Sequence, residues 1–281
     1  MATAARIPAL VVAFALAALG GPAPASAVEA VDLELVIAVD VSGSIDEDEA
    51  KLQRQGYVTA FTDPTVVSAI RSGFNGRIAV LYFEWAGFGH NKIVADWTLI
   101  DGPDSASALA LALSRAPMES ARRTSISGAI DFAVPLFATN AYSGRRRVID
   151  ISGDGVNNFG RPITAARNAA VIAGITINGL PVINDRPGRS RFSGPSTPDL
   201  DLYYENCVIG GPGAFIVVAR GFEDFAAAVR RKLVLEVAGS TPDGRPGLAS
   251  AASPVAKFVP AAERLAPACD IEERQWGDFG R

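Results

Sequence analysis

The sequence predicts an α/β fold in which helices cover both faces of a doubly wound, mostly parallel six-stranded sheet. Two observations lead to this prediction. Short apolar segments alternate along the chain with helical segments of ten or more residues, which is the pattern of a parallel sheet with helical crossovers. Several of the apolar segments are hydrophobic at nearly every position, as strands buried on both faces are.

The order of the expected strands begins with two continuous apolar runs, 33–39 and 77–85, followed by residues 92–100, where apolar and polar side chains alternate. Alternation indicates one solvated face. Because only the short loop 86–91 separates the last two strands, we expect an antiparallel hairpin with 92–100 at the sheet edge. The remaining strands are expected at 147–152, 175–180 and 214–219.

Five segments between or after these strands have the spacing of apolar residues that is typical of helices. They are residues 47–61, 104–116, 125–137, 162–173, with Pro162 in a first turn, and 222–237. The Pro-, Gly-, Ser- and Arg-rich stretch 184–206 is expected to be a long surface loop. We divide the chain into a leader (1–27), one domain (28–238) and a Pro/Ala-rich linker and tail (239–281), whose last twenty residues are expected to dock back on the domain.

The leader has the features of a secretory signal peptide. Arg6 precedes the apolar stretch 7–19, and Ala25-Ser26-Ala27 is a small-x-small cleavage site. We therefore expect cleavage after Ala27 and a periplasmic or extracellular location, with an uncleaved anchor as the alternative. No later segment is long and apolar enough for a transmembrane helix, so no transmembrane segment is expected.

The cysteines and the composition limit the chemistry. Cys207 and Cys269 follow the cleavage site, and an oxidising compartment favours a disulfide between them, with two unpaired thiols as the alternative. A net charge of −4 and the absence of a long basic run make nucleic acid an unexpected partner. A single histidine, His90 in the hairpin loop, excludes a four-ligand Cys/His zinc site and a Ser/His/Asp catalytic group.

Three polar clusters lie where buried strands end or helices begin. They are Asp40-Val41-Ser42-Gly43-Ser44, Ser152-Gly153-Asp154-Gly155 and the segment RTSISGAI at 123–130. Each has a local structural explanation by itself: Ser44 with Glu47 matches a capping box, Thr124 or Ser125 can cap a helix, and Asp154-Gly155 is a common turn. The combination of the three points to a function.

Together the clusters resemble the metal-ion-dependent adhesion site of von Willebrand factor A domains, in which a DxSxS loop is joined by a separate threonine and a separate aspartate. Asp40, Ser42 and Ser44 match the DxSxS positions. Thr124 matches the threonine because Ala129 and Ile130 follow at the offsets of the family's Ala-Leu pair, and Asp154 matches the aspartate after the fourth strand. The resemblance covers about residues 31–237.

A narrower resemblance, through Tyr203-Tyr204 and the run CVIGGPG at 207–213, is to a bacterial family of exported A-like proteins without an assigned function. The broader family implies the strand order 3-2-1-4-5-6, with strand 3 antiparallel at the edge. In such a sheet the crevice lies between strands 1 and 4 at their carboxyl ends. Asp40 and Asp154 follow these two strands, so we expect their side chains to converge.

Two carboxylates and three hydroxyls form an all-oxygen set that suits Mg²⁺, with Mn²⁺ or Ca²⁺ as substitutes. The resemblance implies that Ser42, Ser44 and Thr124 bind the ion directly and that the aspartates act through waters. An open coordination position would then accept a carboxylate from a partner protein that the sequence does not identify. Arg122-Arg123 replace glycines that many relatives carry and either favour an acidic ligand or are solvated surface arginines.

Two further carboxylates need an explanation. Asp150 lies inside a buried strand and is expected to pair with an arginine of the run 145–147. Glu84 is expected to be an ordinary strand-end carboxylate.

The sequence therefore predicts a secreted, non-enzymatic, metal-dependent protein-binding module. One alternative is a haloacid-dehalogenase-like phosphohydrolase, which the strand-end Asp40 and the run 153–157 resemble, although Ser42 occupies the position of its general acid. Another is an A-like scaffold that binds proteins without metal.

Overall fold

The computed structural model describes residues 28–87, 89–183, 199–239 and 266–273. The strands of the main sheet are β2 (Leu33–Asp40), β3 (Ile78–Trp85), β4 (Asn91–Ile100), β6 (Arg147–Gly153), β7 (Thr176–Ile183) and β8 (Ala219–Arg220). The helices are α1 (Glu47–Thr62), α2 (Pro64–Arg71), α3 (Pro103–Arg115), α4 (Ile126–Leu136), α5 (Ile163–Ile172), α6 (Leu200–Tyr203), a π-helical turn η1 (Tyr204–Val208) and α7 (Phe225–Ala238). A small parallel sheet pairs β1 (Glu29–Val31) with β5 (Tyr142–Gly144).

The six-stranded sheet has the order β4-β3-β2-β6-β7-β8, which reads 3-2-1-4-5-6 when its strands are numbered along the chain. All neighbours are parallel except β3 and β4, which form the antiparallel hairpin at the edge. The predicted α/β sheet with an antiparallel edge strand is confirmed. The order in which strands are added to the sheet reverses between β2 and β6, so the carboxyl ends of these parallel neighbours lie side by side where the crevice of such a sheet is found.

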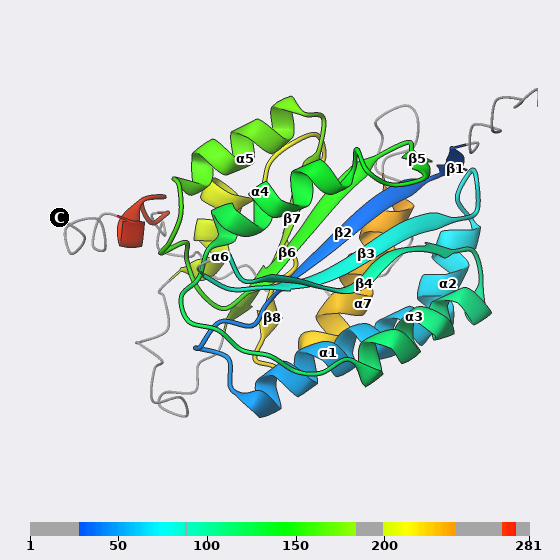
Figure 1. Cartoon of the computed structure of the whole chain (residues 1–281), viewed down its shortest axis with the longest axis horizontal. Coiled ribbons are helices and arrows are strands. Elements are labelled where there is room, and N and C mark those ends of the chain that lie inside the picture. The colour runs from blue at the N-terminus through cyan, green and yellow to red at the C-terminus, as the bar shows by residue number, and fades with distance from the viewer. Residues whose placement is uncertain (1–27, 88, 184–198, 240–265, 274–281) are drawn as a thin grey trace, which may run out of the picture.

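Helices cover both faces of the sheet (Figure 1). Residues of α1, α2, α3 and α7 pack on one face, and residues of α4, α5, α6 and η1 pack on the other. Every residue of β2 and β3 is buried, which explains why these strands are apolar at nearly every position. The edge strand β4 is partly exposed, as its alternating sequence predicts.

The predicted capping box at the start of the first helix is wrong. Helix α1 begins after Asp46, whose side chain accepts hydrogen bonds from the backbone N–H groups of Asp48 and Glu49, while the Glu49 carboxylate accepts from the N–H of Asp46. This capping box lies two residues beyond the predicted Ser44–Glu47 pair, so Ser44 is not the N-cap. Ser125 does cap α4, because its hydroxyl accepts a hydrogen bond from Gly128 N.

Other elements differ from the prediction. The sixth strand, expected over 214–219, has only the two residues of β8, because the preceding chain touches β7 through isolated bridges instead of a continuous ladder. Helix α2 was not predicted. The expected loop 184–206 contains α6 and part of η1 in its described portion, and its residues 184–198 lie outside the described residues.

Asp150 and Glu84 both form buried ion pairs that the sequence did not predict. Asp150 pairs with Lys232 of α7, Nζ to Oδ1 2.7 Å, and not with an arginine of 145–147. Lys232 also binds Glu236 at 2.5 Å. Glu84 pairs with the buried Arg54 of α1. Strand position does not reveal such partners, because both cations come from helices that are distant in the sequence.

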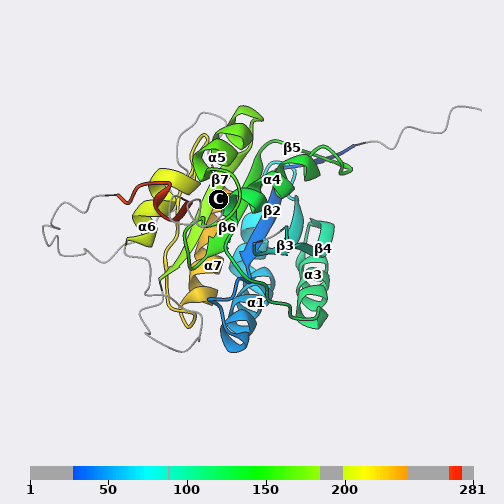
Figure 2. The same ribbon diagram turned by 60° about the vertical axis from the view of Figure 1, so that its left-hand side comes forward.

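The leader 1–27 and most of the tail lie outside the described residues. Residues 266–273 are described and lie beside α6 (Figure 2), which agrees with the expected docking of the C-terminal end. None of the helices in the described ranges has the length and hydropathy that crossing a membrane requires.

Candidate metal site

The structure brings together the five residues that the sequence singled out. Asp40 ends β2, and Ser42 and Ser44 lie on the loop that leads to α1. Asp154 directly follows β6, the parallel neighbour of β2, with Val39 opposite Ser152 in the register. Thr124 lies just before α4. Three segments that are distant in sequence therefore meet at the carboxyl end of the central strands.

Hydrogen bonds join these side chains into one cluster. The Ser44 hydroxyl donates to Asp154 Oδ1 at 2.7 Å. The hydroxyl oxygens of Ser42 and Ser44 are 3.2 Å apart, and the Thr124 hydroxyl donates to the Ser42 hydroxyl at 3.3 Å. Asp40 Oδ1 accepts a hydrogen bond from the backbone N–H of Ser42 at 2.7 Å. The predicted site residues are thus in mutual contact.

Asp40 is completely buried, and its second oxygen, Oδ2, has no hydrogen-bond partner among the described residues. Burial and the charge of Asp154 raise the pKa of the Asp40 carboxyl well above its ordinary value, although the hydrogen bonds from Ser42 oppose this. An ionised Asp40 is therefore costly unless a positive charge or another donor approaches Oδ2.

The pKa of the Asp154 carboxyl is also raised, but by less. Burial raises its pKa to about 6; the hydrogen bond from Ser44 opposes the shift, and the charge of Glu49 adds to it. Two carboxyl groups with raised pKa values, the buried Asp40 and the partly buried Asp154, form a site whose electrostatic balance a cation would restore.

Two asparagines after Asp154 hold the loops of the site together. Asn158 forms two hydrogen bonds with the backbone of Thr124. Its side-chain Oδ1 accepts from Thr124 N at 2.9 Å, and its backbone N–H donates to Thr124 O at 2.9 Å. Asn157 is buried, and its Oδ1 accepts from Ser127 N at 3.0 Å. The Asp154 loop and the start of α4 are thereby fixed relative to each other.

Helix α1 supports the site through two side-chain hydrogen bonds to backbone carbonyls. The Gln53 side chain donates to the carbonyl of Asp40 at 3.3 Å. Arg54 donates to the carbonyl of Ala116 at 2.6 Å, at the start of the segment that leads to Thr124. These contacts depend on long-range pairing and have no local sequence signal.

Arg123, directly before Thr124, has a φ of +68°, a conformation that favours glycine. Its carbonyl accepts from Gly87 N at 2.7 Å, and a Cβ at Gly87 would lie 2.5 Å from Arg123 Cβ. The missing side chain of Gly87 therefore makes room for a non-glycine residue at this turn. The Arg123 guanidinium lies 5.9 Å from the centroid of the Phe159 ring.

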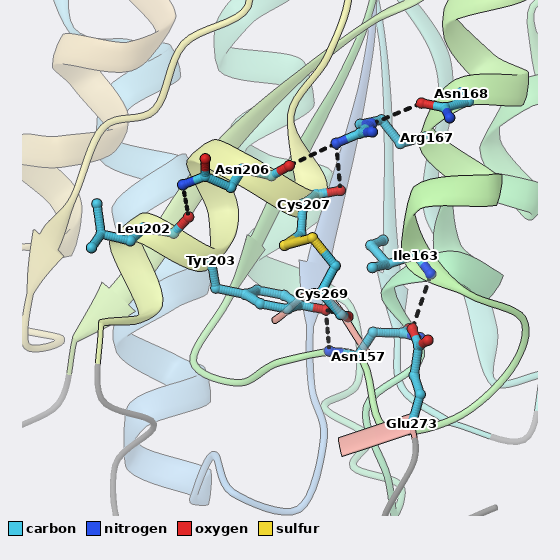
Figure 3. Close-up of a disulfide and its surroundings, with 10 residues drawn as sticks. All are labelled: Asn157, Ile163, Arg167, Asn168, Leu202, Tyr203, Asn206, Cys207, Cys269 and Glu273. Carbon is cyan, nitrogen blue, oxygen red and sulfur yellow. Dashed lines mark hydrogen bonds between the residues drawn. A yellow bond between two sulfur atoms is a disulfide. The ribbon is translucent and has the colours of Figure 1, made fainter. Parts of the chain in front are cut away.

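The C-terminal segment 266–273 is attached to the same region (Figure 3). Cys269 forms a disulfide with Cys207 of η1, with a Cα–Cα distance of 5.3 Å. Glu273 Oε1 accepts from Asn157 Nδ2 at 2.7 Å and from Ile163 N at 2.9 Å. The Tyr203 hydroxyl accepts from Asn157 N at 3.2 Å. The tail thus contacts the residue that ties the Asp154 loop to α4.

Comparison with known proteins shows the family. The sequence model of the family described as "Protein of unknown function (DUF1194)" matches residues 30–241. The chain belongs to this family. A search of curated proteins finds no match.

Solved structures show the fold. A von Willebrand factor type A protein from Catenulispora acidiphila has a TM-score of 0.51 and 16% identity over 74% of this chain and 43% of that chain. The pilus adhesin SpaC from Lactobacillus rhamnosus GG, in its open conformation, has a TM-score of 0.51 and 14% identity over 74% of this chain and 30% of that chain. The chain spans less than half the length of either. It has a von Willebrand factor A-like fold.

The residues of this DUF1194 member fit a divalent cation in their chemistry. The described residues contain no metal-binding group of three or more His, Cys, Asp or Glu side chains. The cluster instead combines two carboxylates with three hydroxyls, and the buried, unpartnered Asp40 Oδ2 is the atom that most needs a positive neighbour. Hard oxygen ligands of this kind suit Mg²⁺, Mn²⁺ or Ca²⁺.

Sequence reasoning missed Gln53, Arg54, Asn157 and Asn158, which support the site without belonging to its motif. Only the Asn157-Asn158 pair had a local signal, because it lies on the short loop that begins at Asp154. Tyr204 is a further residue whose position near the site the sequence did not reveal. It belongs to the narrower family pattern, and its buried hydroxyl has a pKa raised well above the ordinary value by burial and by the charges of Asp40 and Asp154.

Proposed function

We propose that this chain is an exported protein-binding module that holds a divalent cation, Mg²⁺ in the first instance, and uses it to capture an acidic group of a partner protein. The observation that carries the proposal is the convergence of five oxygen side chains from three distant segments. They form a single hydrogen-bonded cluster around a buried carboxylate whose Oδ2 has no partner.

Ser42, Ser44 and Thr124 are the residues that would hold the cation, with Asp40 and Asp154 supplying the negative charge. Hydroxyl ligands are neutral and therefore leave a bound cation electrophilic, so that it attracts a carboxylate from outside. The similarity in fold to the pilus adhesin SpaC supports a binding role.

Export is part of the proposal. The signal-peptide features of residues 1–27, including the small-x-small site at Ala25-Ser26-Ala27, support it, and the Cys207–Cys269 disulfide agrees with an oxidising compartment. Intact-mass measurement on protein from the cell envelope tests it. A mass that begins at Val28 is expected, and retention of Met1 would contradict cleavage.

Metal-dependent capture is tested by pull-down from envelope extract with Mg²⁺ and with a chelator. Wild type should capture its partner only with Mg²⁺, and Asp40→Ala and Thr124→Ala should not capture it at all. Asp96→Ala and Thr62→Ala, which change exposed residues on β4 and α1, are matched controls that should behave as wild type. Capture that persists in chelator would refute the mechanism.

The same proteins are examined by thermal melts. Mg²⁺ at 100 times its dissociation constant should raise the free energy of unfolding of wild type by about 2.7 kcal/mol. Asp40→Ala and Thr124→Ala should lose most of that increment and still fold without metal, because the hydrophobic core lies on both faces of the sheet and does not depend on the site. Turnover of a phosphate ester that Asp40→Ala abolishes would instead support the phosphohydrolase.

A further inference from the structure

Two buried oxygen atoms lie close to Gly153. A Cβ atom at Gly153 would lie 2.9 Å from Asp40 Oδ2 and 2.9 Å from the Tyr204 hydroxyl oxygen. Both oxygens are buried, and neither has a hydrogen-bond partner among the described residues. Because glycine has no side chain, the carboxylate and the phenol can both lie beside the position that a Cβ would occupy.

A second glycine makes room for the ring of Tyr204. A Cβ at Gly179 would lie 2.7 Å from Tyr204 Cδ1. Gly153 and Gly179 lie on the adjacent strands β6 and β7, where Gly179 is opposite Ile151 and Pro181 is opposite Gly153. The ring therefore occupies a slot on the sheet that two missing side chains create, and the slot directs its hydroxyl toward Asp40.

The backbone that carries Tyr204 is held firmly. It opens the π-helical turn η1, which the Cys207–Cys269 disulfide joins to the C-terminal segment. The neighbouring Tyr203 hydroxyl is hydrogen-bonded to Asn157 N at 3.2 Å. Of these adjacent tyrosines, one therefore has a structural partner for its hydroxyl, whereas the other presents its hydroxyl to the site.

We propose that Tyr204 is a positioning residue of the metal site, whose hydroxyl orients the Asp40 carboxylate by donating a hydrogen bond to Oδ2 when a cation is bound. This inference rests on the proposed function. A carboxylate oxygen accepts and a phenol donates, and Asp40 Oδ1 is already engaged by Ser42 N at 2.7 Å. With both oxygens held, the carboxylate has one orientation. Partners of this kind commonly change metal affinity by ten- to a hundredfold.

A purely structural explanation predicts something different. Phenylalanine would fill the slot between the two glycines equally well and would not bury a hydroxyl without a partner. If Tyr204 only filled space, Tyr204→Phe would leave metal affinity unchanged. The proposal predicts that the same substitution weakens metal binding.

The experiment measures the affinity of the exported protein for Mg²⁺ and Mn²⁺ by calorimetry, with a thermal melt in chelator for each variant. Tyr204→Phe should bind about tenfold more weakly than wild type and should melt in chelator at the same or a higher temperature. Tyr82→Phe is the matched control, because Tyr82 is a buried tyrosine in the core on the opposite face. It should bind as wild type does.

A spectroscopic measurement separates positioning from stability. Adding saturating Mg²⁺ should change the near-ultraviolet absorption of tyrosine in wild type and Tyr82→Phe, and this change should be lost in Tyr204→Phe. If Tyr204→Phe fails to fold, the wild-type and Tyr82→Phe spectra decide: a tyrosine change in both supports the proposal, and no change overturns it.

The outcomes distinguish this inference from the proposed function. Metal binding by wild type with equal affinity in Tyr204→Phe overturns the role of Tyr204 and leaves the adhesion-type function standing. A wild type that binds neither Mg²⁺ nor Mn²⁺ overturns both.

Discussion

At the scale of single residues, the site contains a buried carboxylate that lacks a hydrogen-bond partner for one oxygen among the described residues, which lowers the stability of the fold. Asp40 is fully buried with an unpartnered oxygen, whereas Asp32, eight positions earlier, is also buried but has hydrogen-bond partners for both of its oxygens. Asp32 accepts hydrogen bonds from the backbone N–H groups of Asn75 and Gly76 at 2.9 Å each. A buried carboxylate stabilises a fold only in the second situation.

The first prediction uses this contrast. Asp40→Asn should raise the free energy of unfolding in chelator by about 1 kcal/mol or more at pH 8, because the amide removes a poorly solvated charge. It should also abolish the stabilisation by Mg²⁺. Urea unfolding with and without Mg²⁺ measures both effects.

Asp32→Asn is the control and should have the opposite sign, because it weakens a carboxylate that accepts from two backbone donors. A loss of stability for Asp40→Asn in chelator would mean that Asp40 is satisfied in solution without a cation.

The five candidate site residues could be singled out from the sequence because they match a family motif and lie next to strand ends or helix starts, positions that converge in a doubly wound sheet. Their support could not. Asn157 and Tyr204 reach the site through tertiary contacts, and no spacing rule connects them to Asp40. The capping box was misplaced by two residues because Ser44, Asp46, Glu47 and Glu49 offer overlapping patterns.

At the scale of elements, the C-terminal segment and η1 form one covalently joined unit. Its disulfide closes a loop with a sequence separation of 62 residues, and Glu273 completes the hydrogen bonds of Asn157. The unit therefore contributes to stability through the unfolded chain and to the site through a direct contact.

The second prediction concerns this disulfide. Cys207→Ser with Cys269→Ser should lower the free energy of unfolding by about 4 kcal/mol in the chain-entropy model. It should also weaken Mg²⁺ binding, because Glu273 is no longer held at Asn157. Unfolding and calorimetry on the oxidised wild type and the double variant test this. Reduced wild type should match the double variant, and equal stability of all three would contradict the prediction.

Element prediction was accurate where hydrophobic patterns are long and failed where they are short. β2, β3 and α1 have strong patterns and lie within one or two residues of their expected bounds. β8 has two residues, and α6 and η1 together span nine. Such elements are set by tertiary contacts, for example the disulfide and the tyrosine slot, instead of by their own sequence.

At the scale of the whole molecule, the buried group formed by Asp150, Lys232 and Glu236 connects the central strand β6 to the last helix α7. It contains two carboxylates and one ammonium group. Burial and the charge of Glu236 raise the pKa of Asp150 to about 7, against the opposing effect of Lys232. The folded chain therefore retains a proton that the unfolded chain releases near pH 4.

The third prediction is a pH dependence with a definite sign. Because the folded-state pKa of Asp150 is raised, stability in chelator should fall as pH rises from about 4 to about 7, with a slope of at most about 1.4 kcal/mol per pH unit for this one proton. Asp150→Asn should flatten the slope, since one carboxylate and one ammonium then remain. Denaturant unfolding between pH 4 and 8 measures it. An unchanged slope in Asp150→Asn would exclude Asp150 as the source.

The covalent link between η1 and residues 266–273 also has a consequence for proteolysis. A protease that cuts once between residues 240 and 265 separates the chain into two fragments, but Cys207 and Cys269 keep them joined. The nicked protein would migrate as one species on a non-reducing gel and as two after reduction. The C-terminal fragment would then stay attached through the disulfide, with Glu273 still bound at Asn157. Cleavage of the backbone would therefore not by itself remove residues 266–273 from the site.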